Sequence, residues 1–509
     1  MTELDQLINA CLLPVVHCDE VPTWVPKALD DGLAGVVLLP DTGDEEADLR
    51  VTETARALRA HHKNILIAAD EEGGDVTVLE HTTGSSYPGS LALGTADDPE
   101  LTARVAGAIA ADLLAAGFNL DLAPSLDVNS EAGNPVIGVR AFGADPERVA
   151  RHGTAFIMAL QAAGVASAAK HFPGHGATVT DSHRGLPVVE CDLDTFERRE
   201  LAPFAAAVAA GVRCLMTGHV LFPQLDQDHP ATLSRLLLHD LLRGELGFEG
   251  VLLNTVLAME AGRPAAETGA LAVRALAAGS DLLLVPPGGG EDACAIVRAV
   301  INKAVEAREL ETARLEEAAA RVRALALPAP AGAVGTADRA VGLEAARRAV
   351  RSTGPVALGG PATLIEFDAE SRSVAAAAPR RLSSQLPDAA VARTVHVGPG
   401  GPSPEVVLAQ AVGGPAVVAV IDAHRVPWQR AWLGAFLAAR PDAVTVALGL
   451  PEDADQATGP AIRTYGSAPV NARVAAELLW PAVDWAAEPF PRDHATVRRS
   501  PSRRTTAQT

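Results

Sequence analysis

The sequence has few cysteines, few lysines and no long uncharged apolar run, and each shortage argues against a class of protein. The five cysteines among the 509 residues are odd in number and scattered, without a C-x-x-C pair. That pattern argues against a disulfide scaffold or a zinc knuckle. No window of about 18 apolar residues is free of charge, so no membrane span is predicted. The segment Met1–Asp5 has no basic stretch before an apolar core, so no signal peptide is predicted. We therefore expect a soluble, cytoplasmic protein with reduced thiols.

Basic residues are also scarce relative to acidic ones. The chain has 42 Lys and Arg against 63 Asp and Glu, a formal net charge of −21, and only four of its residues are lysines. An acidic excess of this size repels phosphate backbones and anionic lipid surfaces, so neither nucleic acid nor membrane is an expected partner. The apolar fraction of 48% supports large buried cores, and the length predicts two domains.

Short apolar runs alternate with amphipathic segments over the first 290 residues. The runs are brief and rich in β-branched residues or Leu, as parallel strands buried on both faces are. Eight such repeats predict a (β/α)8 barrel of the TIM type, and a doubly wound open sheet is the competing interpretation. The predicted strands are Pro14–His17, Gly35–Leu39, Ile65–Ala69, Phe118–Leu122, Val165–Ala169, Val212–Met216, Gly250–Leu253 and Asp281–Val285. Amphipathic helices are predicted at Pro99–Ala116, Asp145–Ala163 and Leu193–Ala210.

A second α/β pattern follows the barrel. We expect a barrel domain over residues 1–327, closed by a long charged helix at Ile301–Ala326, and a linker over 328–338 that is rich in Pro, Ala and Gly. Residues 339–491 predict a smaller, sandwich-like α/β domain, and the Arg- and Ser-rich tail 492–509 is predicted to be disordered. The elements predicted in that domain are helices at Arg339–Ser352 and Asn471–Leu479 and strands at Pro361–Phe367, Thr394–Val397, Ala416–Ile421 and Ala443–Leu448.

Polar residues gather where the predicted barrel strands end. Asp70–Gly74 follows the third strand, Asp121 and Asp127–Asn129 follow the fourth, Lys170 and His171 the fifth, and Thr217–His219 the sixth. Because the carboxyl ends of barrel strands form one rim, where active sites are built, we expect these side chains to share a pocket.

The densest polar stretch runs from Lys170 to Gly176 and continues at Asp181-Ser182-His183. A carboxylate two residues from an imidazole can fix its tautomer and raise its pKa, which suits Asp181 and His183 to general acid–base chemistry. A metal site is the alternative, because His171, His175, Asp181 and His183 are all possible ligands. The absence of an H-x-H pair on an early strand argues against it.

These residues resemble the K-H-F-P-G-H-G…D-S-H signature of family 3 glycoside hydrolases. The closest branch is similar to the β-N-acetylglucosaminidases that trim peptidoglycan fragments. Further segments share the resemblance: Asp70–Gly74, Asp127–Asn129, Asn134–Gly138 with Arg140, Pro230–Ser234, Leu246–Phe248 and Ala277–Val285. The second α/β domain is similar to that of two-domain members.

The resemblance implies a role for each matching position. Asp70 would hold sugar hydroxyls, while Arg140, Lys170 and His171 would bind the hydroxyls and acetamido group of a non-reducing N-acetylglucosamine residue. His183 would be the acid/base, oriented by Asp181. Hydrolysis in this family retains configuration through a glycosyl-enzyme intermediate and needs a carboxylate nucleophile. No cofactor and no obligate protein partner is implied.

The sequence departs from the family pattern at the nucleophile. Thr255 occupies the position of the expected aspartate, between Asn254 and Val256, and Asp75 and Ala177 replace an arginine and an aspartate usual in the family. Three hypotheses follow. The chain is a retaining β-N-acetylglucosaminidase with a substituted nucleophile, a catalytically impaired sugar-binding or regulatory pseudoenzyme, or a metal-dependent hydrolase on the same barrel.

Overall fold

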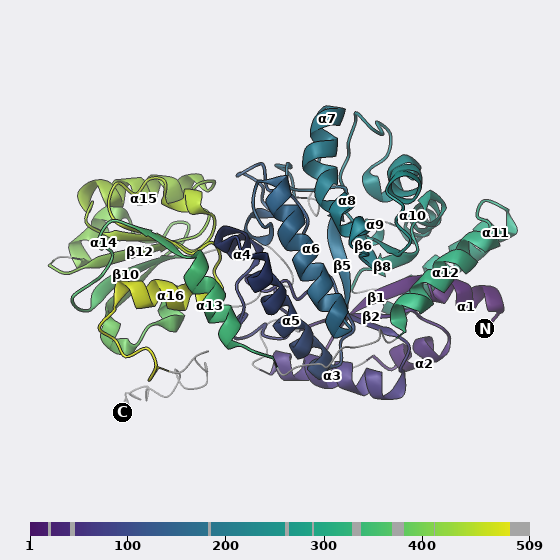
Figure 1. The fold of residues 1–509 in the computed structure, drawn as a ribbon, viewed down its shortest axis with the longest axis horizontal. Helices are drawn as coiled ribbons and strands as arrows, with labels where there is room; N and C mark the ends of the chain where they lie inside the picture. The colour runs from purple at the N-terminus through teal and green to yellow at the C-terminus, as the bar shows by residue number, and fades with distance from the viewer. Residues whose placement is uncertain are drawn as a thin grey trace, which may run out of the picture.

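The chain forms two α/β bodies in a computed structural model (Figure 1). The structure describes residues 1–18, 22–40, 46–181, 185–259, 264–287, 290–327, 337–368, 381–411 and 413–488. The larger body carries the amino terminus, and the smaller one, green to yellow in Figure 1, follows residue 337.

Eight parallel strands close into a barrel in the order of the chain, each pairing with its sequence neighbours and β1 with β8. Closure confirms the predicted TIM-type barrel and excludes the open doubly wound sheet. The strands are β1 Leu12–His17, β2 Gly35–Leu39, β3 Leu66–Ala69, β4 Leu120–Asp121, β5 Ala166–Phe172, β6 Cys214–Thr217, β7 Val251–Asn254 and β8 Leu282–Val285.

Alternate strand residues divide between two apolar cores, as the period of two in a strand requires. One set, which includes Leu13, Val37 and Leu120, draws residues from every strand and fills the barrel. The other set, which includes Leu12 and Val36, packs against the surrounding helices. The barrel is therefore solid, and a ligand can reach only its ends.

The helices around the barrel begin and end where the sequence supplies caps. Asp98 accepts from the backbone N–H groups of Glu100 and Leu101 at the start of α5 (Pro99–Ala116), and Gly117 ends the helix at φ 99°. The same Asp-Pro start and Gly end bound α6 (Pro146–Ala163). The others are α1 Glu3–Asn9, α2 Trp24–Asp30, α3 Ala47–His61, α4 Ser90–Ala96, α7 Leu193–Thr195, α8 Ala202–Ala209, α9 Val256–Met259, α10 Ala265–Ala278, α11 Gly290–Glu306 and α12 Thr312–Ala326.

The predicted single helix Ile301–Ala326 is wrong. The chain turns between α11 and α12, where Arg308 takes a left-handed φ of 59°. The turn sends Leu310 into the core at 4% exposure, and burial of this apolar side chain favours two packed helices over one long exposed one.

The second body is a six-stranded sheet of order β11-β10-β12-β13-β14-β9, with only β9 antiparallel to its neighbour, and helices lie against it. This confirms the predicted smaller α/β fold. The elements are α13 Ala340–Ala349, β9 Arg351–Thr353, β10 Ala362–Phe367, β11 Val391–Val397, α14 Pro404–Gln410, β12 Ala416–Val420, α15 Pro427–Ala439, β13 Val444–Ala447, β14 Ala461–Arg463 and α16 Pro469–Leu479.

The first helix of that body differs from the prediction, and parts of the predicted boundaries are not described. The helix predicted at Arg339–Ser352 ends at Ala349, because Arg351–Thr353 pairs with β14 instead. Residues 328–336 of the predicted linker and the whole predicted tail, 492–509, lie outside the described residues. The predicted domain boundaries therefore stay predictions.

Helix α13 joins the two bodies by packing on α4 and α5 (Figure 1). Polar contacts reinforce the junction, with Arg104 paired to Glu344 at 2.8 Å. Asp75 accepts from both the backbone N–H and the hydroxyl of Ser467, at 2.9 and 2.8 Å. Among the described helices, none is both long and apolar enough to span a bilayer.

Candidate active site

The polar residues singled out from the sequence lie at or beyond the carboxyl ends of the strands. Asp70 follows β3, Lys170 and His171 lie near the carboxyl end of β5, and Thr255 follows β7. The prediction placed Lys170 and His171 just after the strand, but β5 extends to Phe172. All of these strands are parallel members of one closed barrel, so their ends meet at the same rim.

Lys170 is the centre of a buried charge cluster. Its Nζ lies 2.5 Å from Asp70 Oδ1 and 2.7 Å from Glu72 Oε1, and its side chain is 2% exposed. Burial alone would favour the neutral amine, but the two carboxylates hold the pKa of Lys170 above its usual value. The lysine is therefore fixed in its charged form.

Arg140 binds the same glutamate. Its Nε and Nη2 lie 3.0 and 2.7 Å from the two carboxylate oxygens of Glu72, a bidentate pair. Burial opposes ionisation of Glu72, but Arg140 and Lys170 hold its pKa well below its usual range. The structure thus brings two predicted sugar ligands, Arg140 and Lys170, onto Glu72, to which the sequence analysis gave no role, and the third, Asp70, onto Lys170.

His171 is oriented by Asp127, a second residue without a predicted role. The imidazole Nδ1 lies 2.7 Å from Asp127 Oδ2, and the carboxylate also accepts from the backbone N–H of His175 at 2.7 Å. Burial opposes the charge on Asp127, but His171 and its other partners lower its pKa to about 2. Burial lowers the pKa of His171, so the neutral ring donates from Nδ1 and leaves Nε2 as an acceptor.

Two glycines shape the loop after β5 because side chains would not fit. A Cβ on Gly176 would lie 1.9 Å from the carbonyl oxygen of Val128, and one on Gly174, at φ 143°, would lie 2.4 Å from Glu200 Oε2. His175 fills the space between them, with Nδ1 at 2.7 Å from the Thr178 hydroxyl. Burial lowers the pKa of His175 to about 4, so this imidazole is neutral near neutral pH.

Only half of the predicted acid–base pair falls within the description. Asp181 is described and partly buried, while His183, with Ser182, lies outside the described residues. The His183–Asp181 dyad therefore stays a prediction.

Thr255 is held by hydrogen bonds to Thr217. Its hydroxyl donates to the Thr217 carbonyl at 3.0 Å, and its backbone N–H donates to the Thr217 hydroxyl at 3.2 Å. Thr255 is 6% exposed. Neither of these partners is a carboxylate or an imidazole, so neither can take the proton of the threonine hydroxyl as a general base.

The two glutamates that follow Asp70 already have partners. Glu72 serves the two cations, and Glu71 accepts from the backbone N–H groups of Val78 and Leu79, both at 2.9 Å. Burial raises the pKa of Glu71 to about 8. It is therefore protonated near neutral pH and is no anionic nucleophile.

The metal alternative is tested only in part, because His183, one of its four possible ligands, lies outside the described residues. Among the residues that the structure describes, no group of three or more His, Cys, Asp or Glu side chains is arranged to hold a metal ion. None of the five cysteines forms a disulfide, and four of them are buried.

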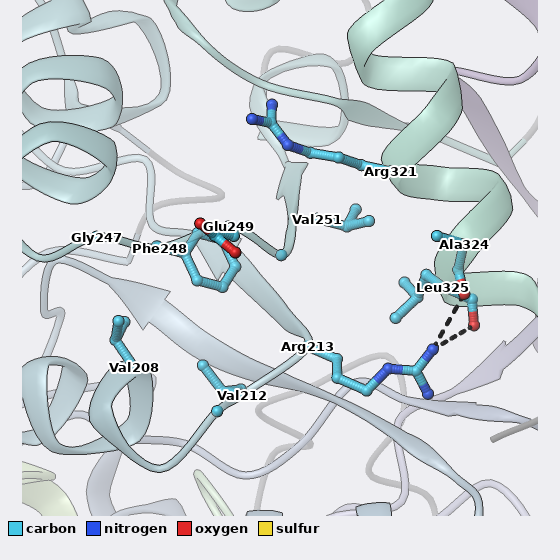
Figure 2. Close-up of a pocket in the computed structure, with 12 residues that line it drawn as sticks. Val208, Val212, Arg213, Gly247, Phe248, Glu249, Val251, Arg321, Ala324 and Leu325 are labelled. Carbon is cyan, nitrogen blue, oxygen red and sulfur yellow. Dashed lines mark hydrogen bonds between the residues drawn. The ribbon is translucent and has the colours of Figure 1, made fainter. Parts of the chain in front are cut away.

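A pocket at the opposite end of the barrel is separate from this site (Figure 2). Its cavity of about 380 Å³ lies beside the amino ends of β6 and β7 and against α12. Arg213 there donates to the carbonyls of Ala324 and Leu325, and Arg321 is paired with Asp281 and Glu317. Both arginines of this pocket already have protein partners, and none of the predicted site residues lines it.

Comparisons with known proteins agree with this geometry. A family model described as the glycosyl hydrolase family 3 N-terminal domain matches residues 9–325. A beta-hexosaminidase from Pseudomonas aeruginosa is 39% identical over 243 residues, which cover 47% of this chain and 71% of the relative. Beta-hexosaminidase A from Pseudoalteromonas piscicida is 34% identical over 270 residues, 48% of this chain but only 45% of that relative.

The likeness extends to the second body in a solved structure. A glycoside hydrolase family 3 beta-N-acetylglucosaminidase from Paenibacillus sp. str. FPU-7 superposes with a TM-score of 0.82 and 31% sequence identity. The superposition covers 95% of this chain and 97% of that one. The two bodies of the chain are thus arranged as in a known two-domain relative.

Proposed function

The chain belongs to glycosyl hydrolase family 3, and from that premise we propose that its barrel binds the N-acetylglucosamine residue of an amino-sugar glycan while its hydrolytic step is impaired. The glycan we propose is a peptidoglycan fragment met in the cytoplasm. The hydrogen bond from the Thr255 hydroxyl to the Thr217 carbonyl carries this proposal, because the residue at the nucleophile position donates its proton to a carbonyl and not to a base.

The sugar-binding half of the proposal rests on the cluster around Glu72. Lys170 and Arg140 are held charged, and Asp70 is 25% exposed in its side chain, so its carboxylate can meet a ligand. An ammonium, a guanidinium and a carboxylate together offer donors and acceptors to the hydroxyls and acetamido group of a sugar. His171 adds Nε2 as an acceptor. Glu72 holds Lys170 and Arg140 in place, Lys170 pairs with Asp70, and Asp127 holds His171.

The hydrolytic half rests on chemistry. Retaining hydrolysis needs a carboxylate that attacks the anomeric carbon and a second group that protonates the leaving oxygen. We propose His183, oriented by Asp181, as the acid/base, but Thr255 supplies no carboxylate. Loss of a nucleophile costs on the order of 10⁴ to 10⁶ in rate.

A second candidate is a working β-N-acetylglucosaminidase that retains activity despite Thr255. The arrangement of Asp70, Arg140, Lys170 and His171 favours it, because the same groups would hold a sugar in position for hydrolysis. Its nucleophile would have to come from outside the position of Thr255.

Restoring the carboxylate separates the two candidates. Hydrolysis of a chromogenic aryl N-acetylglucosaminide is measured for the wild type, Thr255→Asp, Thr255→Asn and His183→Ala. We expect activity only in Thr255→Asp, with Thr255→Asn as the uncharged control of the same shape. A wild-type rate well above that of His183→Ala would contradict the impaired enzyme and support the second candidate.

Binding is tested separately. Calorimetric titration with N-acetylglucosamine is expected to give heat with the wild type and much less with Arg140→Ala or Lys170→Ala. No detectable heat with this sugar or its chitooligosaccharides would overturn the sugar-binding proposal.

A further inference from the structure

His424, in the second body, contacts a loop of the barrel that builds the sugar site. The residue follows β12, and its Nε2 lies 3.0 Å from the carbonyl oxygen of Ala132 in the barrel. Its Nδ1 lies 2.6 Å from Asp453 Oδ1, and its side chain is 10% exposed. We propose that His424 is a positioning residue for the sugar site, acting through the loop at residues 131–137.

The two bonds fix the orientation of the imidazole. A carbonyl oxygen only accepts, so Nε2 donates a proton to Ala132. Asp453 is fully buried in its side chain and also accepts from the backbone N–H groups of Asp422 and His424, both at 3.1 Å. Asp453 is therefore fixed in place, and it holds the ring with Nε2 toward the barrel loop.

The contacted loop leads directly to one wall of the site. Asn134, two residues after Ala132, is fully buried, and its amide donates to the carbonyls of His175 and Gly176 at 2.9 and 3.1 Å. These two residues belong to the glycine-shaped loop that follows His171. The position of Asn134 therefore fixes the position of that loop.

The same loop leads to a second wall. Asn134 Oδ1 accepts from the backbone N–H groups of Val136 and Ile137 at 2.9 and 2.8 Å. The Val136 carbonyl in turn accepts from Arg140 Nη1 at 3.2 Å. A displacement of the loop at Ala132 is thus transmitted both to Arg140 and to the turn at His175.

Removal of His424 should leave the two bodies joined. The packing of α13 on α4 and α5, the Arg104–Glu344 pair and the Ser467–Asp75 bonds do not involve it. Variants at His424 therefore report on the loop and not on separation of the domains.

The test compares His424→Ala and His424→Gln with the control His396→Ala, an exposed histidine of the same sheet. Amide hydrogen exchange of residues 131–140 and 174–178 is measured without ligand, and affinity for N-acetylglucosamine is measured by calorimetry. We expect His424→Ala to speed exchange in both segments and to weaken binding at least fivefold. His424→Gln, whose amide can still donate to Ala132, should recover part of the loss, and the control should change neither.

The rescue by His424→Gln adds a readout that loss of packing alone would not give. The affinity arm rests on the proposed sugar binding, whereas the exchange arm does not. Unchanged exchange in His424→Ala, or faster exchange with unchanged affinity, would overturn the inference. If that variant fails to fold, His424→Phe, which fills the space but cannot donate to Ala132, takes its place in both measurements.

Discussion

Thr255 donates its hydroxyl proton to the backbone carbonyl of Thr217 across 3.0 Å. The bond gives the side chain a structural role at the position where family members are expected to carry their nucleophile. Because the hydroxyl proton faces a carbonyl and not a base, this contact supports the proposal that hydrolysis is impaired.

The first prediction concerns this hydroxyl. Thr255→Val keeps the shape of the side chain and leaves the buried Thr217 carbonyl without its donor, which should cost about 1 kcal/mol in free energy of unfolding. Any residual glycosidase rate should stay unchanged, because the hydroxyl does not attack the substrate. Urea unfolding and an aryl N-acetylglucosaminide assay measure the two quantities. A loss of activity without a loss of stability would show that Thr255 is itself the nucleophile.

The second prediction concerns the buried lysine. Lys170→Met leaves Asp70 and Glu72 without their shared cation, so the free energy of unfolding should fall by about 3 to 5 kcal/mol. Binding of N-acetylglucosamine should be lost. Lys303→Met is the matched control, because Lys303 is exposed on α11, and its effect on unfolding should be within about 0.5 kcal/mol. Equal stability of the two variants would contradict the charge cluster described around Glu72.

The third prediction concerns the loop after β5. Gly176→Ala would bring a Cβ to 1.9 Å from the Val128 carbonyl oxygen, so backbone must shift, and the cost should be about 3 kcal/mol. Gly107→Ala, inside α5, meets nothing within 4 Å and should instead stabilise the chain by about 0.5 to 1 kcal/mol. Thermal unfolding of both variants checks the opposite signs. A tolerated Gly176→Ala would mean that the loop is less closely packed on Val128 than described.

Much of the barrel could be predicted from sequence because its signals are local. Asp98-Pro99 and Gly117 mark the ends of α5, and the bounds Pro99–Ala116 were predicted without error. The two three-residue strands β9 and β14 could not be predicted, since a strand of that length is stabilised by its partner and not by its own pattern.

The site was predictable only in part, for a similar reason. Asp70, Arg140, Lys170 and His171 were found from motifs, but the roles of Glu72 and Asp127 depend on which donor lies beside each carboxylate in space. The substitution at Asp75 was visible in the sequence, whereas its partner Ser467 is 392 residues away. Contacts of this kind depend on how the two bodies pack, and that packing cannot be predicted from a local sequence pattern.

The fourth prediction concerns Glu200, which packs behind Gly174 with Oε2 buried and without a hydrogen-bond partner. Burial raises its pKa from 4.5 to about 7, although Arg199 opposes the shift. Between these values the unfolded chain ionises Glu200 while the folded chain keeps it protonated. Folding therefore takes up a proton, and the free energy of unfolding should fall by about 3 kcal/mol as the pH rises from 4.5 to 7.

Glu200→Gln resembles the protonated carboxyl and does not titrate, so it should remove this share of the pH dependence. Urea unfolding at pH 5 and pH 8 should show a smaller fall in stability for the variant than for the wild type, with the variant the more stable of the two at pH 8. Glu190→Gln, at an exposed position of the same segment, should keep the wild-type pH dependence. Parallel pH profiles for the wild type and Glu200→Gln would mean that Glu200 is ionised in the folded chain. In that case its charge would be stabilised by Arg199, 2.6 Å away, more strongly than burial opposes it.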